Sequence, residues 1–389
     1  MTLNADGDLA PSLVRASTPL VERDTSAIED IVQQCASASA EVCLEQRTAR
    51  PEGQLSPEVV TMLQRLSEST PSFDVAWHPC FGRLRRAMFG GGVDDGALAH
   101  VAGHVSSFEP FEWRIVARFE ERLLWQNVIL PASRNWDVIP NHAGDDVRIG
   151  LDHSREIHLQ RADEGWISDD LVVSSLQASG NADRPFRIVE ASSVSGFQPV
   201  ATASSLSPAE VGEMCDAALT LLRECSPAYH DWIGDVVRYV VPLDGTDGVL
   251  RSASDDYWPG MLQISFPSKP AALAEMFVHE TAHQYFHIVR ALGPVHDDSD
   301  TRLYFSPVKQ KERPLDRVLL AYHAFANVLL FYDLCIKAGL DDDEYCRQNY
   351  RRHVRELEVL EQHLRGNPAL TRTGQLLCEP LWKCLASVG

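Results

Sequence analysis

The sequence predicts an α+β fold that is mainly helical and contains a small antiparallel sheet. Apolar residues recur at helical spacing between Asp24 and Glu68, and again from Ser207 to about Cys225. Between Asp146 and Val200, short stretches alternate apolar and polar residues and are separated by Asp, Gly and Pro, which is typical of antiparallel strands. Two long apolar helical patterns in the second half of the chain complete the prediction.

The length and the order of these patterns predict two lobes. The 389 residues exceed the size at which a single hydrophobic core usually stops growing. Residues 1–20 are rich in Ser, Ala, Thr and Pro, and we expect them to be flexible. Residues 21–200 would then form an N-terminal helical and β lobe, and residues 201–389 a C-terminal lobe.

Composition excludes several classes of protein. A formal net charge of -20 argues against binding of nucleic acid, which depends on clustered Lys and Arg. The nine cysteines are scattered, odd in number and free of CxxC pairs, so neither a zinc ribbon nor a disulfide framework is indicated. The N-terminus lacks the pattern of a signal peptide, and we find no apolar run of the length that spans a membrane. We therefore expect a cytoplasmic protein without a membrane partner.

The segment His279-Glu280-Thr281-Ala282-His283 is the strongest chemical signal. It lies in a predicted helix that starts at Pro270, follows a predicted strand at 261–266 and stops at Gly293-Pro294. Histidines four positions apart share one face of a helix, so both imidazoles can bind one metal ion. Glu280, next to the first ligand, can reach a metal-bound water or bond to a ligand. The sequence therefore predicts a metal site with His279 and His283 as ligands.

A third ligand has to come from outside this motif. His323 is our first candidate, because it lies in a second apolar helix where a polar ring needs a partner. Glu312 is an alternative carboxylate ligand, and His323 can equally be a core histidine bonded to a backbone carbonyl. His287 lies ~12 Å along the helix axis from His279, too far to share the same ion.

The chain resembles the HExxH-type peptide-modification proteins that act on ribosomally made peptides. The segments that carry the resemblance are 277–283, Leu303-Tyr304-Phe305-Ser306-Pro307, Arg313-Pro314-Leu315, the helix 318–328, Trp77-His78-Pro79 and Arg251-Ser252-Ala253-Ser254. The resemblance covers most of the chain, and its specific matches lie in the carboxy-terminal third. It departs at Pro307-Val308-Lys309, where the family commonly has Pro-Trp-Arg.

The resemblance implies iron(II)- and 2-oxoglutarate-dependent β-hydroxylation of a residue in a precursor peptide, with the N-terminal lobe as the site of peptide recognition. Such an enzyme needs a cation, usually with a hydroxyl, for the distal carboxylate of 2-oxoglutarate. Arg313 is the expected anchor, with Arg251 and Ser254 as alternatives, because guanidinium binds carboxylate in a two-point fork. Lys309 stands where the family's arginine would be and would hold the carboxylate less rigidly.

Two other functions remain open at this stage. The motif alone favours a zincin-like lobe and zinc-dependent peptide hydrolysis, with Glu280 as the general base. No metzincin-type third histidine follows the motif, however, since the next histidine stands in Gly293-Pro294-Val295-His296. A catalytically silent scaffold that recruits the peptide is the other alternative, and metal content would separate it from both enzymes. The sequence does not indicate an oligomeric state.

Overall fold

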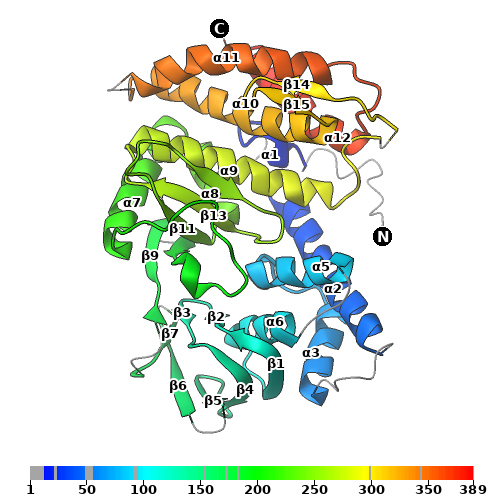
Figure 1. The fold of residues 1–389 in the computed structure, drawn as a ribbon, viewed down its shortest axis with the longest axis vertical. Coiled ribbons are helices and arrows are strands. Elements are labelled where there is room, and N and C mark those ends of the chain that lie inside the picture. Colours follow the sequence, from blue (N-terminus) through cyan, green and yellow to red (C-terminus); the bar gives the residue numbers. More distant parts are fainter. Residues whose placement is uncertain are drawn as a thin grey trace.

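The computed structural model describes most of the chain and has a mixed helix and sheet architecture, as the sequence predicts. Figure 1 shows that α9 crosses the molecule between the C-terminal helices and a sheet. The described residues are 13–21, 24–48, 56–90, 95–152, 155–163, 165–170, 174–181, 184–297, 299–341 and 344–388.

Helices lie near both ends of the described chain and also between its groups of strands. They are α1 (Val14–Ser17), α2 (Ser26–Thr48), α3 (Pro57–Glu68), α4 (Phe73–Ala76), α5 (Pro79–Gly90), α6 (Asp95–Phe108), the 3₁₀ turn η1 (Ala191–Ser193), α7 (Pro208–Cys225), α8 (Pro227–Val236), α9 (Pro270–Arg290), α10 (Leu315–Lys337), α11 (Tyr345–Leu364) and α12 (Arg372–Leu385).

The strands lie between α6 and α10. They are β1 (Trp113–Glu121), β2 (Leu124–Trp125), β3 (Val128–Ile129), β4 (Ser133–Pro140), β5 (Asp146–Leu151), β6 (Arg155–Ala162), β7 (Gly165–Ile167), β8 (Ser174–Ser175), β9 (Gln177–Asn181), β10 (Arg184–Ile188), β11 (Tyr239–Asp244), β12 (Ser252–Ser254), β13 (Met261–Phe266), β14 (Tyr304–Ser306) and β15 (Lys311–Arg313).

The predicted antiparallel sheet is confirmed and is larger than expected. Its five strands follow the order β1-β4-β5-β6-β7, and every neighbouring pair is antiparallel. Alternate residues of β5, such as Val147 and Ile149, are fully buried, because successive side chains of a strand point to opposite faces. This sheet forms the part of the molecule farthest from α9 in Figure 1.

A second five-stranded sheet supports the helix of the metal motif. Its order is β12-β13-β11-β10-β9, with β10, β11 and β13 parallel and the two edge strands antiparallel. All residues of β13 are buried, as is typical of a parallel strand covered on both faces. Because β9 and β10 belong to this sheet, the lobe boundary predicted at residue 200 cuts through it.

The helix α10 is largely buried and packs against α9. By length and hydropathy it is the one helix among the described residues that would suffice to cross a membrane, which the sequence analysis did not expect. However, 72% of its most apolar window is buried inside the molecule. Its apolar character is therefore accounted for by core packing.

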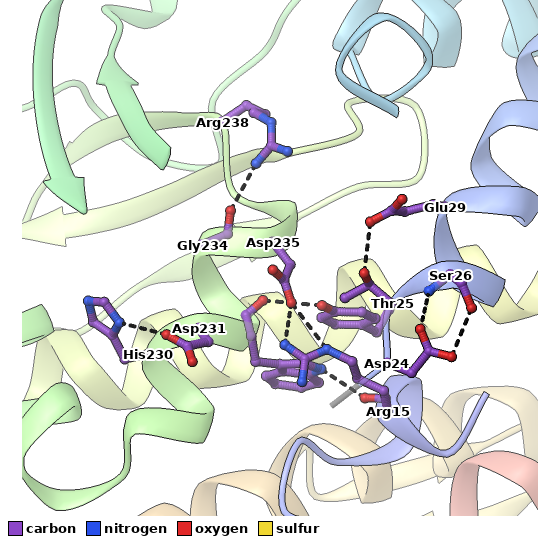
Figure 2. A network of polar contacts seen from close by, with 12 residues as sticks. Arg15, Asp24, Thr25, Ser26, Glu29, His230, Asp231, Gly234, Asp235 and Arg238 are labelled. Atoms are coloured by element: carbon purple, nitrogen blue, oxygen red, sulfur yellow. Dashed lines mark hydrogen bonds and ion pairs between the residues drawn. The ribbon is translucent and has the colours of Figure 1, made fainter. Parts of the chain in front are cut away.

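The N-terminal segment 13–21 corrects the expectation of a flexible N-terminus, while residues 1–12 lie outside the described residues. Arg15 is 3% exposed and forms a buried ion pair with Asp235 of α8. The Arg15 carbonyl accepts a hydrogen bond of 2.9 Å from the Trp232 indole. Figure 2 shows the Arg15 guanidinium directed at Asp235. The composition of this segment suggested flexibility. Composition could not reveal these contacts, because the partners lie far away in the sequence.

We expect Asp235→Ala to lower the free energy of unfolding by ~3–5 kcal/mol, because it leaves the Arg15 charge buried without its carboxylate. Urea denaturation of the full chain measures the change. Asp231→Ala is the matched control on the same helix, since the Asp231 side chain is 64% exposed, and it should cost less than ~1 kcal/mol. Equal effects of the two variants would contradict a structural role for the buried pair.

Candidate metal centre

The metal motif occupies the middle of α9, which begins at Pro270 as predicted. Most of this helix is buried, including Met276, Phe277 and Val278 just before the motif. His279 and His283 are only partly buried, whereas Glu280 is 2% exposed. The two imidazoles therefore lie at the one side of the helix that remains accessible.

The structure brings His279, Glu280 and His283 together. One ligand atom from each residue lies within 4.8 Å of the others, close enough for a single metal ion. The two imidazole rings meet edge to face with centroids 4.6 Å apart. Nε2 of His279 lies 4.0 Å from Oε1 of Glu280. Two imidazoles and a carboxylate are therefore available as a donor set.

The chemistry of the three side chains fits a metal ion. Nδ1 of His283 is buried and makes no hydrogen bond within the described part of the chain. Burial, followed by the charges of His353 and Lys309, lowers the pKa of His279 to about 3. Burial also lowers the pKa of His283 well below its usual value. Both rings are therefore neutral at pH 7, the form in which imidazole binds metals.

Two serines of β12 hold the Glu280 carboxyl group. The Ser252 hydroxyl donates to Oε1 at 2.6 Å and the Ser254 hydroxyl donates to Oε2 at 2.8 Å. Both hydroxyls face Glu280 because alternate residues of a strand point the same way. Burial raises the pKa of Glu280 to about 7, although the two serines lower it. Glu280 can therefore gain or lose a proton near neutral pH.

The anchors predicted for 2-oxoglutarate lie in different places. Ser254 belongs to the site, but its hydroxyl is bonded to Glu280. Arg251 precedes β12 and forms an ion pair of 2.6 Å with Asp247 on the surface, so its guanidinium is already engaged. Arg313 lies on β15, opposite Tyr304 of β14, and is partly buried.

Lys309 is the cation whose charge acts on both His279 and Glu280. It is exposed in the turn between β14 and β15, and none of the described residues forms an ion pair with it. Burial is the largest cause of the pKa shifts of His279 and Glu280. The Lys309 charge is a smaller cause and lowers both pKa values. The sequence analysis named Lys309 only as a substitute for the family's arginine.

His323, the predicted third ligand, lies outside the group of three, although its charge acts on His283. His323 is fully buried in α10, and its Nε2 lies 2.9 Å from the carbonyl oxygen of Ala16. This is the core histidine bonded to a backbone carbonyl that the sequence left open. Glu312 is exposed on β15 and also lies outside the group.

His287 lies outside the group formed by His279, Glu280 and His283. It lines a separate small cavity with Arg85 and Asp256. Burial lowers the pKa of His287 to about 4, with the Asp256 charge acting in the opposite direction. His287 is therefore a useful control residue on the same helix.

Three further residues near the motif were missed by sequence reasoning. Ser252 could have been found from its alternation with Ser254, whereas the other two carry no local signal. The Phe325 ring of α10 packs edge-on against His279, with centroids 4.9 Å apart. His353 of α11 packs against Phe325 at 4.8 Å, and its Nδ1 lies 2.7 Å from Glu356.

Comparison of the sequence with protein-family models gave no match, and comparison with curated proteins gave none either.

Replacing His279 or His283 with Ala should remove most of the metal bound at this site, because each variant deletes one of two imidazole donors. Metal analysis after dialysis against zinc, and separately against iron(II) without oxygen, measures the loss. His287→Ala is the matched control on α9 and should keep the metal of this site. Full occupancy in both motif variants would rule out the assignment.

The paired change Ser252→Ala and Ser254→Ala should raise the pKa of Glu280 above about 7, because two hydrogen bonds that favour the charged carboxylate are lost. Metal affinity of the native chain should fall as pH drops below about 7, where Glu280 becomes protonated. In the paired variant this fall should begin at higher pH.

Cobalt(II) titrations at several pH values measure both curves. Ser268→Ala is the control, because its hydroxyl bonds to the Ser265 carbonyl instead of to Glu280. Overlapping curves for the native chain and the paired variant would show that the serines do not tune Glu280.

Proposed function

We propose that this chain is an iron(II)- and 2-oxoglutarate-dependent dioxygenase that hydroxylates a β-carbon in a ribosomally made precursor peptide. The observation that carries the proposal is the donor set on α9: two neutral imidazoles and one carboxylate, with no third histidine in the described group. Two histidines and one carboxylate are the ligands typical of non-haem iron(II) oxygenases. The motifs shared with the HExxH-type peptide-modification proteins support the same reaction.

In this proposal His279, His283 and Glu280 hold the metal. Iron(II) with 2-oxoglutarate would supply the oxidising power that amino-acid side chains lack. Ser252 and Ser254 fix the orientation of the Glu280 carboxylate and favour its ionised form. The lobe around α9 would be zincin-like, which is supported by the edge strand β12 lying beside the HExxH helix.

Lys309 takes the distal carboxylate of 2-oxoglutarate, with Arg313 as the alternative at the other end of the β14–β15 hairpin. Lys309 is exposed, and its charge acts on both His279 and Glu280. An ammonium group binds a carboxylate as a point charge and not as a fork. Arg251 is the weaker candidate, because Asp247 already occupies its guanidinium.

The proposed partner is a peptide, bound with help from the N-terminal lobe, and neither nucleic acid nor a membrane. The net charge of -20 disfavours an acidic partner. We place the protein in the cytoplasm, where a reducing environment suits iron(II) and the free cysteines of the described chain.

One observation favours a second function, a zinc metallopeptidase. A carboxyl group with a pKa of about 7 next to two imidazoles is suited to act as general base on a metal-bound water. That mechanism requires a third protein ligand other than Glu280. We therefore rank it second.

The decisive experiment reconstitutes the chain with iron(II) without oxygen and then adds 2-oxoglutarate, oxygen and a candidate precursor peptide. The proposal expects succinate to form and a peptide to gain one oxygen atom by mass spectrometry, with both results requiring iron and 2-oxoglutarate. Shortened peptide fragments formed with zinc and without 2-oxoglutarate would establish the peptidase instead. A protein that takes up no metal and carries out neither reaction would favour the scaffold.

Glu280→Gln separates the two enzymes. As a dioxygenase, the variant should lose part of its metal affinity and turnover, because the amide keeps one oxygen donor and remains a hydrogen-bond partner for the serines. As a peptidase it should lose nearly all turnover, because the amide cannot accept a proton. Succinate and fragment yields at saturating metal measure the difference. Complete loss of succinate formation from metal-loaded protein would contradict the first expectation.

A further inference from the structure

A second cluster of metal-binding side chains lies away from α9. His78 immediately precedes α5, Cys80 lies in the first turn of α5, and His104 lies near the end of α6. One ligand atom from each lies within 4.8 Å of the others. All three residues are buried, with exposures of 4%, 2% and 2%. Sequence analysis gave no role to Cys80 or His104.

The hydrogen bonds of His104 leave one buried nitrogen without a partner. Its Nε2 lies 3.0 Å from the Val75 carbonyl oxygen and therefore donates to it. Nδ1 of the same ring carries the lone pair and makes no hydrogen bond to any described residue. Leaving a buried acceptor without a hydrogen bond costs about 1–3 kcal/mol. We therefore expect Nδ1 to have a partner that no described residue supplies.

The His78 ring stacks on the His104 ring, with centroids 3.6 Å apart and planes inclined by 12°. Its Nδ1 accepts the Cys80 backbone N–H at 3.2 Å, and its Nε2 lies 3.1 Å from the Tyr239 hydroxyl. One of these two contacts has to open for His78 to become a ligand.

We propose that His78, Cys80 and His104 form a second metal site for a zinc-class divalent cation. Thiolate and imidazole are the donors found in structural zinc sites. Structural zinc is four-coordinate, and His100, whose charge acts on His78, is a candidate for the fourth donor. His100 precedes His104 by one turn of α6 and lies 3.3 Å from Glu121. This proposal is independent of the function proposed for α9.

The site lies where α5 and α6 meet the sheet β12-β13-β11-β10-β9. Tyr239, which contacts His78, belongs to β11, and the Trp77 indole donates to the Val236 carbonyl at 2.6 Å. A Cβ atom added at Gly82 would lie 2.2 Å from the Tyr257 carbonyl oxygen, so α5 approaches this region closely. A metal ion bound here would fix α5 and α6 against the sheet and stabilise their contact.

Cobalt(II) alone is the probe, because bound thiolate gives it a charge-transfer absorption that imidazole and carboxylate do not. The full chain carrying His279→Ala and His283→Ala removes the α9 site. We expect this background to bind about one equivalent of cobalt(II) with a thiolate band. Adding Cys80→Ser should abolish the band, and adding His104→Gln should weaken binding at least about tenfold.

Cys335→Ser is the matched control, since Cys335 is buried and interacts with the thiols of Cys225 and Cys346. This variant should keep the band. A background protein without a thiolate band, or a band lost in Cys335→Ser and retained in Cys80→Ser, would overturn the site.

A second measurement does not depend on the folding of Cys80→Ser. Excess zinc should raise the thermal unfolding midpoint of the background protein by at least ~2 °C, because the metal binds only the folded site. Circular dichroism follows the transition. An unchanged midpoint overturns the proposal even if the cysteine variant fails to fold.

Discussion

The burial of α9 constrains the rest of the structure. This helix is enclosed by a sheet on one side and by helices on the other, and a buried polar side chain without a partner is costly, so several of its polar side chains bond to other elements. The Gln284 amide oxygen accepts the Gly260 backbone N–H at 3.0 Å, and the Tyr285 hydroxyl donates to the Trp232 carbonyl at 3.2 Å. Glu280 is held by the two serines of β12. Elements from separate parts of the chain thus fix the rotation of α9, and with it the direction of the two imidazoles.

The same burial determines the charges of the donors on α9. Desolvation keeps the imidazoles of His279 and His283 neutral and holds the Glu280 carboxyl group near its titration point. Ligands of this kind are available without first losing a proton from nitrogen. The set on α9 contains nitrogen and oxygen donors, whereas the set around Cys80 adds sulfur. The two sites would therefore prefer different metals, because thiolate selects softer ions than carboxylate does.

Local patterns in the sequence predicted local structure well. Pro270 starts α9, and the strand expected at 261–266 has those limits in the structure. The errors all involve partners distant in sequence. His323 was assigned to the metal because spacing cannot show that the Ala16 carbonyl, 307 residues away, would bond to its Nε2. Spacing also could not show that β10 pairs in parallel with β11 across α7 and α8, so that one sheet contains strands from both sides of residue 200. Composition likewise could not reveal the burial of Arg15.

The N-terminal segment 13–21 has a consequence for biosynthesis. Its Ser17 side chain donates to the Leu377 carbonyl at 2.9 Å, and its Ser17 carbonyl accepts from the Asn327 amide at 2.9 Å. These partners lie more than 300 residues later in the chain than Ser17. The segment can dock earlier on α8 through Arg15, but its contacts with α10 and α12 form only after those helices have left the ribosome. Contacts of such long range slow folding, so the apolar surface that α10 covers stays accessible to chaperones until α10 has been made.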